Sequence, residues 1–193
     1  MCSGARPRTS HALQFAAMRG ALLAVLVGLC GCAARGVDLD GRAVDPLAGA
    51  GVVALVFTSS GCPIGNRAAP ELARVYQRWQ ARGVAFWLVY PDDDAAAVRA
   101  HRAAYGLAAP ALLDPRHALV RAAGAGVTPE AAVFRGRKRV YLGRLDDRAV
   151  DFARERPTAT HHDLDDALAA VVAGGTPAEA ITPAFGCAIG DPR

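Results

Sequence analysis

The sequence predicts an α/β fold with a mixed central sheet flanked by helices, and three features of its hydrophobic pattern support this class. Continuous apolar runs at 52–57 and 84–90 have the length of strands that are covered on both faces. The amphipathic segment between them completes a right-handed parallel strand–helix–strand unit. Two later short strands, 130–134 and 139–143, are joined by residues 136–138 and suit an antiparallel hairpin. With 193 residues, of which 52% are apolar, the chain can bury one core.

The first 31 residues differ in character from the rest of the chain. They contain three arginines and no acidic residue, and they lead into an apolar run at 21–34. This run is too short to cross a bilayer as a helix and has the length of the apolar region of a signal peptide. We therefore predict that residues 1–31 are a signal peptide and that the protein is exported.

The apolar run ends in Leu29-Cys30-Gly31-Cys32, which resembles the lipobox of bacterial lipoproteins. The resemblance implies cleavage before Cys32, lipidation of Cys32, and a tether at 32–36 that holds the protein on a membrane of the cell envelope or periplasm. A plain secretory signal and an uncleaved anchor are the alternatives. Cleavage removes three arginines from a formal net charge of +4 and leaves +1, so no basic face for a nucleic-acid partner is visible.

The cysteine count singles out two residues. Removal of the signal takes away Cys2 and Cys30, and lipidation uses Cys32, so Cys62 and Cys187 remain. In an oxidising compartment, such a pair can form a disulfide that is either structural or catalytic.

The elements of the predicted domain, 37–173, follow in order. It opens with a hairpin, because 37–44 alternates apolar and polar residues about Asp40-Gly41. After the strand at 52–57 comes a helix that starts behind Cys62 and contains Pro70, which should kink it. The apolar side chains of this helix recur every three or four residues and form one stripe: Ile64, Ala68, Leu72, Val75 and Trp79.

The second half of the domain is predicted to be mostly short elements. Thr160-His161-His162-Asp163 resembles a capping box and should start the last helix. The final 20 residues, from Gly174 onward, are rich in Gly and Pro and are expected to form an extended tail over the domain. The other predicted elements are an Ala-rich helix with an acidic first turn at 92–105, a strand at 111–113 and a helical segment at 117–123.

Cys62 is the strongest candidate nucleophile. It immediately precedes a helix, and the amide groups and positive dipole end of a helix N-terminus favour the reactive thiolate. Pro63 suits the first helical position, where its missing N–H would have no partner in any case. The alternative is a buried, inert structural cysteine.

The second landmark is Thr128-Pro129, immediately before the strand at 130–134. A cysteine at a strand–helix junction and a distant proline before a strand together resemble the thioredoxin-like superfamily, in which a cis-proline lies against the active-site cysteine. The resemblance implies that Thr128 and Pro129 face Cys62, and that Pro70 matches the proline that kinks the active-site helix.

A narrower resemblance, over residues 36–191, is to bacterial redoxin-domain proteins, which are related to peroxiredoxins and TlpA-like thioredoxins. It implies an antioxidant redoxin or thiol-disulfide oxidoreductase that acts on protein or small-molecule disulfides and thiols, or on peroxide, and that needs no cofactor. The segments that carry it are CPIGNRAAPEL, VAFWLVYPD, VTPEAAVF, YLGRLDDR and FGCAIGD.

The sequence departs from the active-site motifs of both thioredoxins and peroxiredoxins. Gly65 replaces the second cysteine of a C-x-x-C dithiol, so another thiol must resolve a mixed disulfide. Cys187 is the candidate, because the roughly 13 residues that separate it from the last helix can span up to about 45 Å. A structural disulfide that fastens the tail, or a free thiol, is the alternative. We therefore take Cys62, Cys187, Thr128 and Pro129 as candidate catalytic residues.

A peroxiredoxin-like peroxidase is the first alternative function. Leu55 and Ser59 stand where a peroxiredoxin site has Pro and Thr, and no arginine adjoins the predicted cis-proline turn. Arg144 or Arg148 would have to take that arginine's place in space. Their cluster with Asp146 and Asp147 reads as a salt-bridged turn or as a site rim.

Two further alternatives remain. A Sco-like copper-binding protein would use Cys62, Cys187 and one of His161 or His162 as ligands, although Asn66 occupies the position of the second cysteine in that motif. A non-catalytic thioredoxin-fold module would use its disulfide only to secure the tail.

Overall fold

The computed structural model describes residues 34–192 apart from 50 and 153. All of them belong to the unit 32–193, one of two units into which the chain divides. The predicted signal peptide at 1–31 and the predicted lipidation site Cys32 lie outside the described residues. Within the described part, no helix has the length and hydrophobicity needed to cross a membrane.

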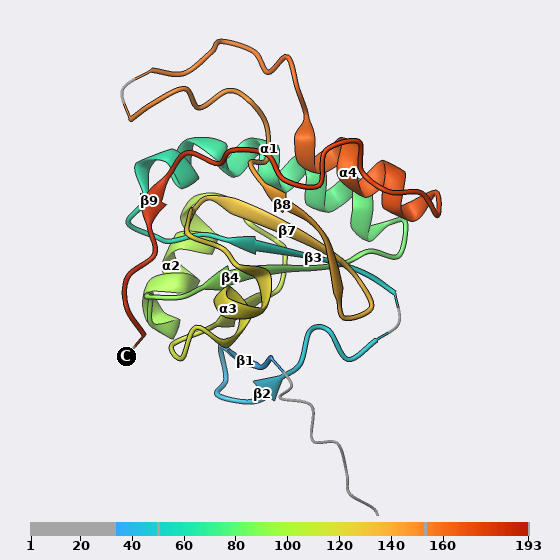
Figure 1. Cartoon of the computed structure of the whole chain (residues 1–193). Helices are drawn as coiled ribbons and strands as arrows, with labels where there is room; N and C mark the ends of the chain where they lie inside the picture. The colour runs from blue at the N-terminus through green and yellow to red at the C-terminus, as the bar shows by residue number, and fades with distance from the viewer. Residues whose placement is uncertain (1–33, 50, 153, 193) are drawn as a thin grey trace, which may run out of the picture. The chain divides into compact units, whose positions relative to one another are not determined.

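A seven-stranded mixed sheet forms the centre of the domain, as predicted (Figure 1). Its strand order is β2-β1-β5-β4-β3-β7-β8, in which β3, β4 and β5 run parallel and the other neighbours pair antiparallel. The strands are β1 (Gly36–Asp38), β2 (Ala43–Val44), β3 (Val52–Phe57), β4 (Ala85–Tyr90), β5 (Ala111–Leu113), β7 (Glu130–Arg135) and β8 (Lys138–Gly143). Separately, β6 (Val127–Thr128) pairs with β9 (Cys187–Ala188).

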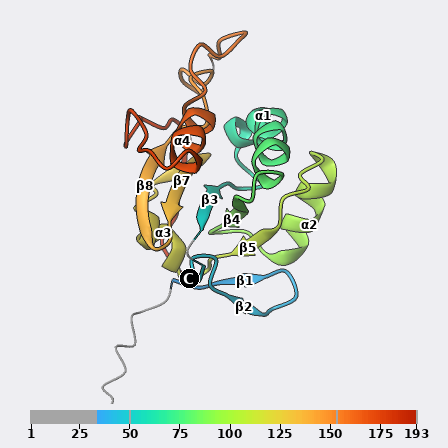
Figure 2. The same ribbon diagram turned by 90° about the vertical axis from the view of Figure 1, so that its right-hand side faces the viewer.

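Helices cover both faces of this sheet, as Figure 2 shows from the side. The helices are α1 (Pro63–Gln80), α2 (Ala95–Ala104), α3 (Ala118–Ala123) and α4 (Asp163–Val172). Apolar residues of α1, α2 and α4 share one buried cluster with the inward face of the strands. Residues of α3 share a second cluster with the opposite face. Because both faces are covered, β3 and β4 are continuous apolar runs rather than alternating ones.

The predicted capping box at 160–163 is wrong. The residue that precedes α4 is His162, and its side chain makes no capping hydrogen bond. The Thr160 hydroxyl donates instead to the buried carboxylate of Asp147. The helix predicted at 92–105 is shorter than expected, since Asp94 caps α2 by accepting from the Ala97 amide at 2.8 Å. The preceding acidic residues are thereby left outside the helix.

Two segments after β8 run over the helical core. Residues 144–152 and 154–162 form an excursion that projects from the body in both views (Figures 1 and 2). The tail, coloured red in Figure 1, leaves α4 and crosses back to β9, as predicted. Midway it is bound to β8: the Leu142 amide donates to the Ala180 carbonyl at 2.9 Å, and the Thr182 amide donates to the Leu142 carbonyl at 3.1 Å. The tail is therefore an ordered part of the domain.

Candidate active site

Cys62 stands at the junction of β3 and α1, where the sequence places it. The chain continues the sheet for one residue beyond β3, because the Thr58 amide donates to the Val89 carbonyl at 2.9 Å. It then turns, and Cys62 becomes the N-cap of α1, with its Sγ accepting from the Gly65 amide at 3.5 Å. Pro63 occupies the first turn of the helix. The Cys62 side chain is buried, with a residue exposure of 1%.

The Thr128–Pro129 peptide bond is cis and lies directly against this cysteine. Sγ of Cys62 is 2.9 Å from the Thr128 carbonyl oxygen. The structure thus brings together Cys62, Thr128 and Pro129, although Cys62 and Thr128 are 66 positions apart in the sequence.

Cys187 completes the site from the tail. It is the register partner of Thr128 in the β6–β9 pair, and its Sγ lies 2.8 Å from that of Cys62. Both cysteines are free thiols, Cys62 buried and Cys187 partly exposed. Cys187, from the tail, therefore supplies the second thiol that the active-site helix supplies in a C-x-x-C site.

The surroundings make the two sulfurs chemically unequal. Burial raises the pKa of Cys62, but hydrogen bonds from the Cys187 thiol, the Gly65 and Cys187 amides and the Thr128 side chain outweigh it, so the pKa lies below its usual value. Burial also raises the pKa of Cys187 to about 11, together with the hydrogen bond to Cys62 and the charge on Cys62. Loss of one proton from the pair therefore gives a Cys62 thiolate beside a Cys187 thiol. The thiolate is the nucleophilic form.

A chain of polar side chains supports the turn that precedes Cys62. The Asn66 amide nitrogen donates to the Ser60 carbonyl at 3.2 Å, which directs its oxygen toward Nε2 of His101 at 2.8 Å. Nε2 must then carry the proton, so Nδ1 accepts from the Tyr90 hydroxyl at 2.9 Å. Burial lowers the pKa of His101 and so favours the neutral ring that this arrangement needs.

Asp93, in the connection between β4 and α2, holds the same turn. Its two carboxylate oxygens each accept from the Ser60 amide at 3.3 Å, and Oδ1 also accepts from the Ser60 hydroxyl. Sequence reasoning missed Asp93 and the Tyr90–His101–Asn66 chain. The only available signal was the acidic run after the second strand, which resembles an ordinary start of a helix.

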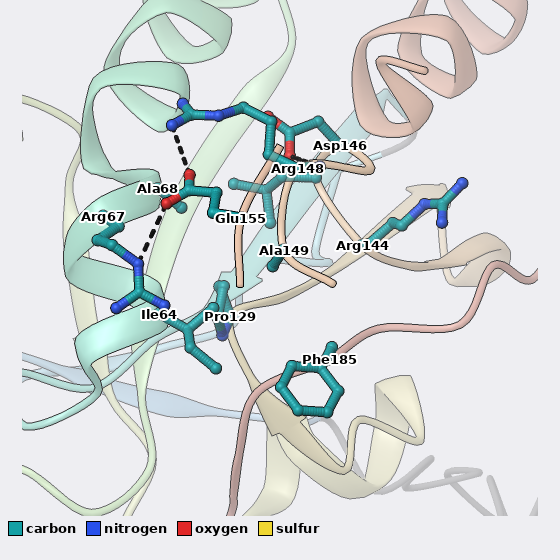
Figure 3. Close-up of a pocket in the computed structure, with 11 residues that line it drawn as sticks. Ile64, Arg67, Ala68, Pro129, Arg144, Asp146, Arg148, Ala149, Glu155 and Phe185 are labelled. Carbon is teal, nitrogen blue, oxygen red and sulfur yellow. Dashed lines mark hydrogen bonds and ion pairs between the residues drawn. The ribbon is translucent and has the colours of Figure 1, made fainter. Parts of the chain in front are cut away.

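A pocket is lined by residues of α1, the cis-proline turn, the tail and the excursion after β8 (Figure 3). Three of its lining residues are close neighbours of the site in the chain: Ile64 follows Cys62 by two positions, Pro129 is the cis-proline, and Phe185 precedes Cys187 by two. Phe185 also packs edge-on against Phe152 of the excursion, with ring centroids 4.8 Å apart. The remaining lining residues are Arg67, Ala68, Arg144, Leu145, Asp146, Arg148, Ala149 and Glu155.

The arginines of this pocket are already paired. Glu155 binds Arg67 at 3.2 Å and also pairs with Arg148, as the dashed lines in Figure 3 mark. Arg144 is held by Asp163 through contacts of 2.8 and 3.2 Å. The cluster after β8 is therefore a salt-bridged turn, and its Arg144, Asp146 and Arg148 also line the pocket.

Glu130, His161 and His162 have settings of their own outside the cysteine pair. Glu130 is buried, and its Oε2 accepts from the Gly126 amide at 2.8 Å. His161 and His162 are exposed near the start of α4, where Nδ1 of His162 lies 3.4 Å from Glu71. Across the described residues, no three His, Cys, Asp or Glu side chains gather in a way that could hold a metal ion. The copper alternative therefore has no ligand set in this part of the chain.

A cysteine that caps a helix and faces a cis-proline turn, on a mixed sheet covered by helices, defines the thioredoxin-like class. Within that class, the AhpC/TSA family model matches residues 35–141, and the chain belongs to this family. The family consists largely of thiol-dependent oxidoreductases and peroxidases. No curated protein sequence matches the chain.

Solved structures agree on the fold. A hypothetical protein from Sinorhizobium meliloti is 25% identical, with a TM-score of 0.68 over 80% of this chain and 88% of its own. An uncharacterized conserved protein from Geobacillus kaustophilus is also 25% identical, with a TM-score of 0.69 over 80% and 86%. A secreted Mycobacterium tuberculosis disulfide oxidoreductase homologous to Escherichia coli DsbE is 20% identical, with a TM-score of 0.51 over 72% and 94%.

Proposed function

We propose that this chain is an exported thiol-disulfide oxidoreductase that reduces disulfides in proteins, with Cys62 as nucleophile and Cys187 as resolving cysteine. The 2.8 Å between their sulfur atoms carries the proposal. A nucleophilic cysteine that attacks a disulfide becomes trapped in a mixed disulfide unless a second thiol can reach it. Gly65 offers no such thiol, and the tail supplies one.

The reaction has two exchange steps. The Cys62 thiolate attacks one sulfur of the substrate disulfide, and the other sulfur leaves as a thiolate that takes up a proton. Cys187 then loses its proton and attacks Sγ of Cys62, which forms the Cys62–Cys187 disulfide and releases the second substrate thiol. The substrate disulfide gains two electrons and two protons, and the cysteine pair loses them. Thr128 and Pro129 act as positioning residues, because their turn contacts Cys62 and aligns Cys187.

An external dithiol would restore the reduced pair. Its thiolate attacks Cys187, because this sulfur is the more exposed of the two, and Cys62 departs as the thiolate with the lower pKa. The second thiol of the donor then releases Cys187, and the donor leaves as a disulfide.

Export rests on the sequence pattern of residues 1–31, and membrane attachment on lipidation of Cys32. Mass spectrometry of the protein from its native cell tests both. We expect an N-terminus at Cys32 that carries diacylglycerol, and release from the membrane in Cys32→Ala. An N-terminus at Met1 or Met18 in the membrane fraction would contradict this part of the proposal.

Reduction of a disulfide-containing model protein tests the activity. Wild type should turn over with a dithiol donor, Cys62→Ser should be inactive, and Cys187→Ser should accumulate a mixed disulfide through Cys62 on non-reducing gels. Unchanged turnover in Cys62→Ser would reject the proposal. Consumption of hydrogen peroxide by wild type, without protein disulfide reduction, would establish the peroxidase alternative. A Cys62–Cys187 disulfide that resists mild reductant would establish the non-catalytic one.

A further inference from the structure

We propose that the docked strand β9 is an inhibitory strap, and that its departure opens a groove for an extended polypeptide that carries the substrate disulfide. This inference rests on the proposed function, because it concerns access to the same cysteine pair. It starts from the position of the tail rather than from the chemistry of the sulfurs.

While the strap is in place, Cys62 is the more reactive of the two cysteines and Cys187 is the more accessible. Cys62 favours the thiolate but is 1% exposed, whereas Cys187 is partly exposed. With a pKa of about 11, Cys187 is a thiolate in only about one molecule in ten thousand at pH 7. The reactive sulfur is therefore covered, and the accessible sulfur is protonated. Neither attacks a partner until β9 moves.

The backbone pairing that holds the strap is short. Strand β9 pairs with β6 at only two positions, Cys187 with Thr128 and Ala188 with Val127. Beyond it, the Ile189 amide donates to the Gly126 carbonyl at 3.1 Å. Such a short pairing is marginal on its own, so it can open locally without unfolding the domain. The anchor of the tail on β8 would keep the released strand close by.

Gly186 allows the strap to lie unusually near the cis-proline turn. A Cβ at this position would clash with the Thr128 carbonyl oxygen and would lie 2.6 Å from the carbonyl carbon. These are backbone atoms, so the side chain of any other residue would push the strand away. The close cover over Cys62 therefore depends on a glycine immediately before Cys187.

The space under the strap suits a polypeptide. When β9 leaves, the backbone of β6 loses its strand partner, and the pocket loses Phe185 from its wall beside Ile64 and Pro129. An incoming extended segment can pair with β6 in the same way, with its cysteine opposite Thr128. After the mixed disulfide forms, β9 displaces this segment from β6 and returns Cys187 to Cys62 for the resolving step. The tail itself shows which side chain fits next to the site, namely an aromatic one two positions before the cysteine.

Alkylation of Cys62 in the fully reduced protein tests the strap without any substrate. We expect the limiting rate of iodoacetamide labelling of Cys62, reached at a pH above its pKa, to be at least tenfold higher in Gly186→Ala than in wild type. Mass spectrometry of the peptide that contains Cys62 measures this rate. The control is Gly51→Ala, outside the tail, because a Cβ there meets nothing within 4 Å. Labelling of Cys62 should be unchanged in that control.

A second variant protects the test against misfolding of Gly186→Ala. Asp92→Ala removes the carboxylate that accepts from the Gly190 amide at 3.2 Å, and it should also accelerate labelling. Equal labelling rates in wild type and both variants would overturn the strap. Because labelling needs no turnover, the strap can fail while disulfide reduction stands, and the reverse can also occur.

Two oxidised peptides test the groove. They differ only at the position two residues before the cysteine, which is Phe in one and Asp in the other. We expect kcat/KM to be at least tenfold higher for the Phe peptide than for the Asp peptide. In Phe185→Ala this ratio should be smaller, because a tail without Phe185 competes less well with the peptide for the groove. Equal rates for both peptides would reject the assigned groove.

Discussion

Thr128 and Cys187 are register partners across β6 and β9, and this pairing sets the second sulfur 2.8 Å from Cys62. The cis-proline turn therefore contacts both cysteines: Thr128 pairs with Cys187, and the Thr128 carbonyl oxygen lies 2.9 Å from Sγ of Cys62. The geometry of the dithiol depends on a strand pair in place of a local helical turn.

Removal of the Cys187 thiol should raise the pKa of Cys62. In Cys187→Ala, burial still opposes ionisation of Cys62, but the hydrogen bond from Cys187 is gone. The converse variant, Cys62→Ala, should lower the pKa of Cys187 from about 11, because it removes the neighbouring charge. The pH dependence of the cysteine 13Cβ chemical shifts measures both. An unchanged midpoint for Cys62 in Cys187→Ala would show that the two thiols do not interact.

Loss of His101 should destabilise the domain and remove part of its pH dependence. In His101→Leu, the Tyr90 hydroxyl and the Asn66 amide lose a buried partner, which costs about 1–3 kcal/mol each. In wild type the pKa of His101 is lowered by burial, so below about pH 6.5 the unfolded chain binds a proton that the folded one does not. The free energy of unfolding should therefore decrease as the pH is lowered below about 6.5.

Urea unfolding at pH 5 and pH 7 measures this effect. The difference between the two pH values should be smaller in His101→Leu than in wild type. His161→Ala is the matched control, because His161 is exposed and should leave the difference unchanged. An equal pH dependence in His101→Leu would mean that the lowered pKa of His101 is not what links stability to pH.

Asp165 should be the main polar link between α1 and α4. Its buried carboxylate accepts from the Trp79 indole, and it pairs with Arg78 at 2.7 Å and Arg74 at 3.2 Å. Asp165→Ala leaves the indole N–H without an acceptor and should cost about 2–4 kcal/mol in urea unfolding. Asp165→Asn keeps an acceptor for Trp79 and should lose less. Alkylation of Cys62 should stay at the wild-type rate in both, since neither touches the site.

Gly143 should be required for anchoring the tail. A Cβ at Gly143 would lie 2.5 Å from the Thr182 carbonyl oxygen and 2.9 Å from the Thr182 amide nitrogen. Gly143→Ala should therefore detach the tail from β8 and cost about 1–3 kcal/mol through overpacking. Gly51→Ala is the control, because a Cβ there meets nothing within 4 Å. Limited proteolysis after α4 reports the detachment, and an intact tail would contradict the anchor.

Sequence periodicity was sufficient for the framework. The apolar run that predicts β3 matches it residue for residue, because a strand covered on both faces needs every side chain apolar. The cap of α4 was mispredicted because Thr160 has a stronger alternative in the Asp147 carboxylate, a contact that no local pattern shows. Local motifs predict ends of elements only where no distant group competes.

The candidate site was predictable only where its residues carry local sequence signals. Cys62 and Thr128-Pro129 carry local signals, a strand–helix junction and a proline before a strand. The placement of Cys187 depends on a pairing between distant segments, so sequence could establish its reach but not its register. His101 carries no pattern at all: a single histidine in an Ala-rich helix gives no indication that it completes a buried chain between Tyr90 and Asn66.

The separation of the two sulfurs by 125 positions makes the dithiol a property of the folded state. In a C-x-x-C site the thiols remain near each other after unfolding, whereas here unfolding would disperse them and lower their effective concentration. A disulfide that closes so long a loop restricts the unfolded chain and should stabilise the fold by about 4–5 kcal/mol in the chain-entropy model. Folding and oxidation therefore form one thermodynamic cycle. Variants that weaken the fold enough to unfold the reduced protein should shift the redox equilibrium of the pair toward the dithiol.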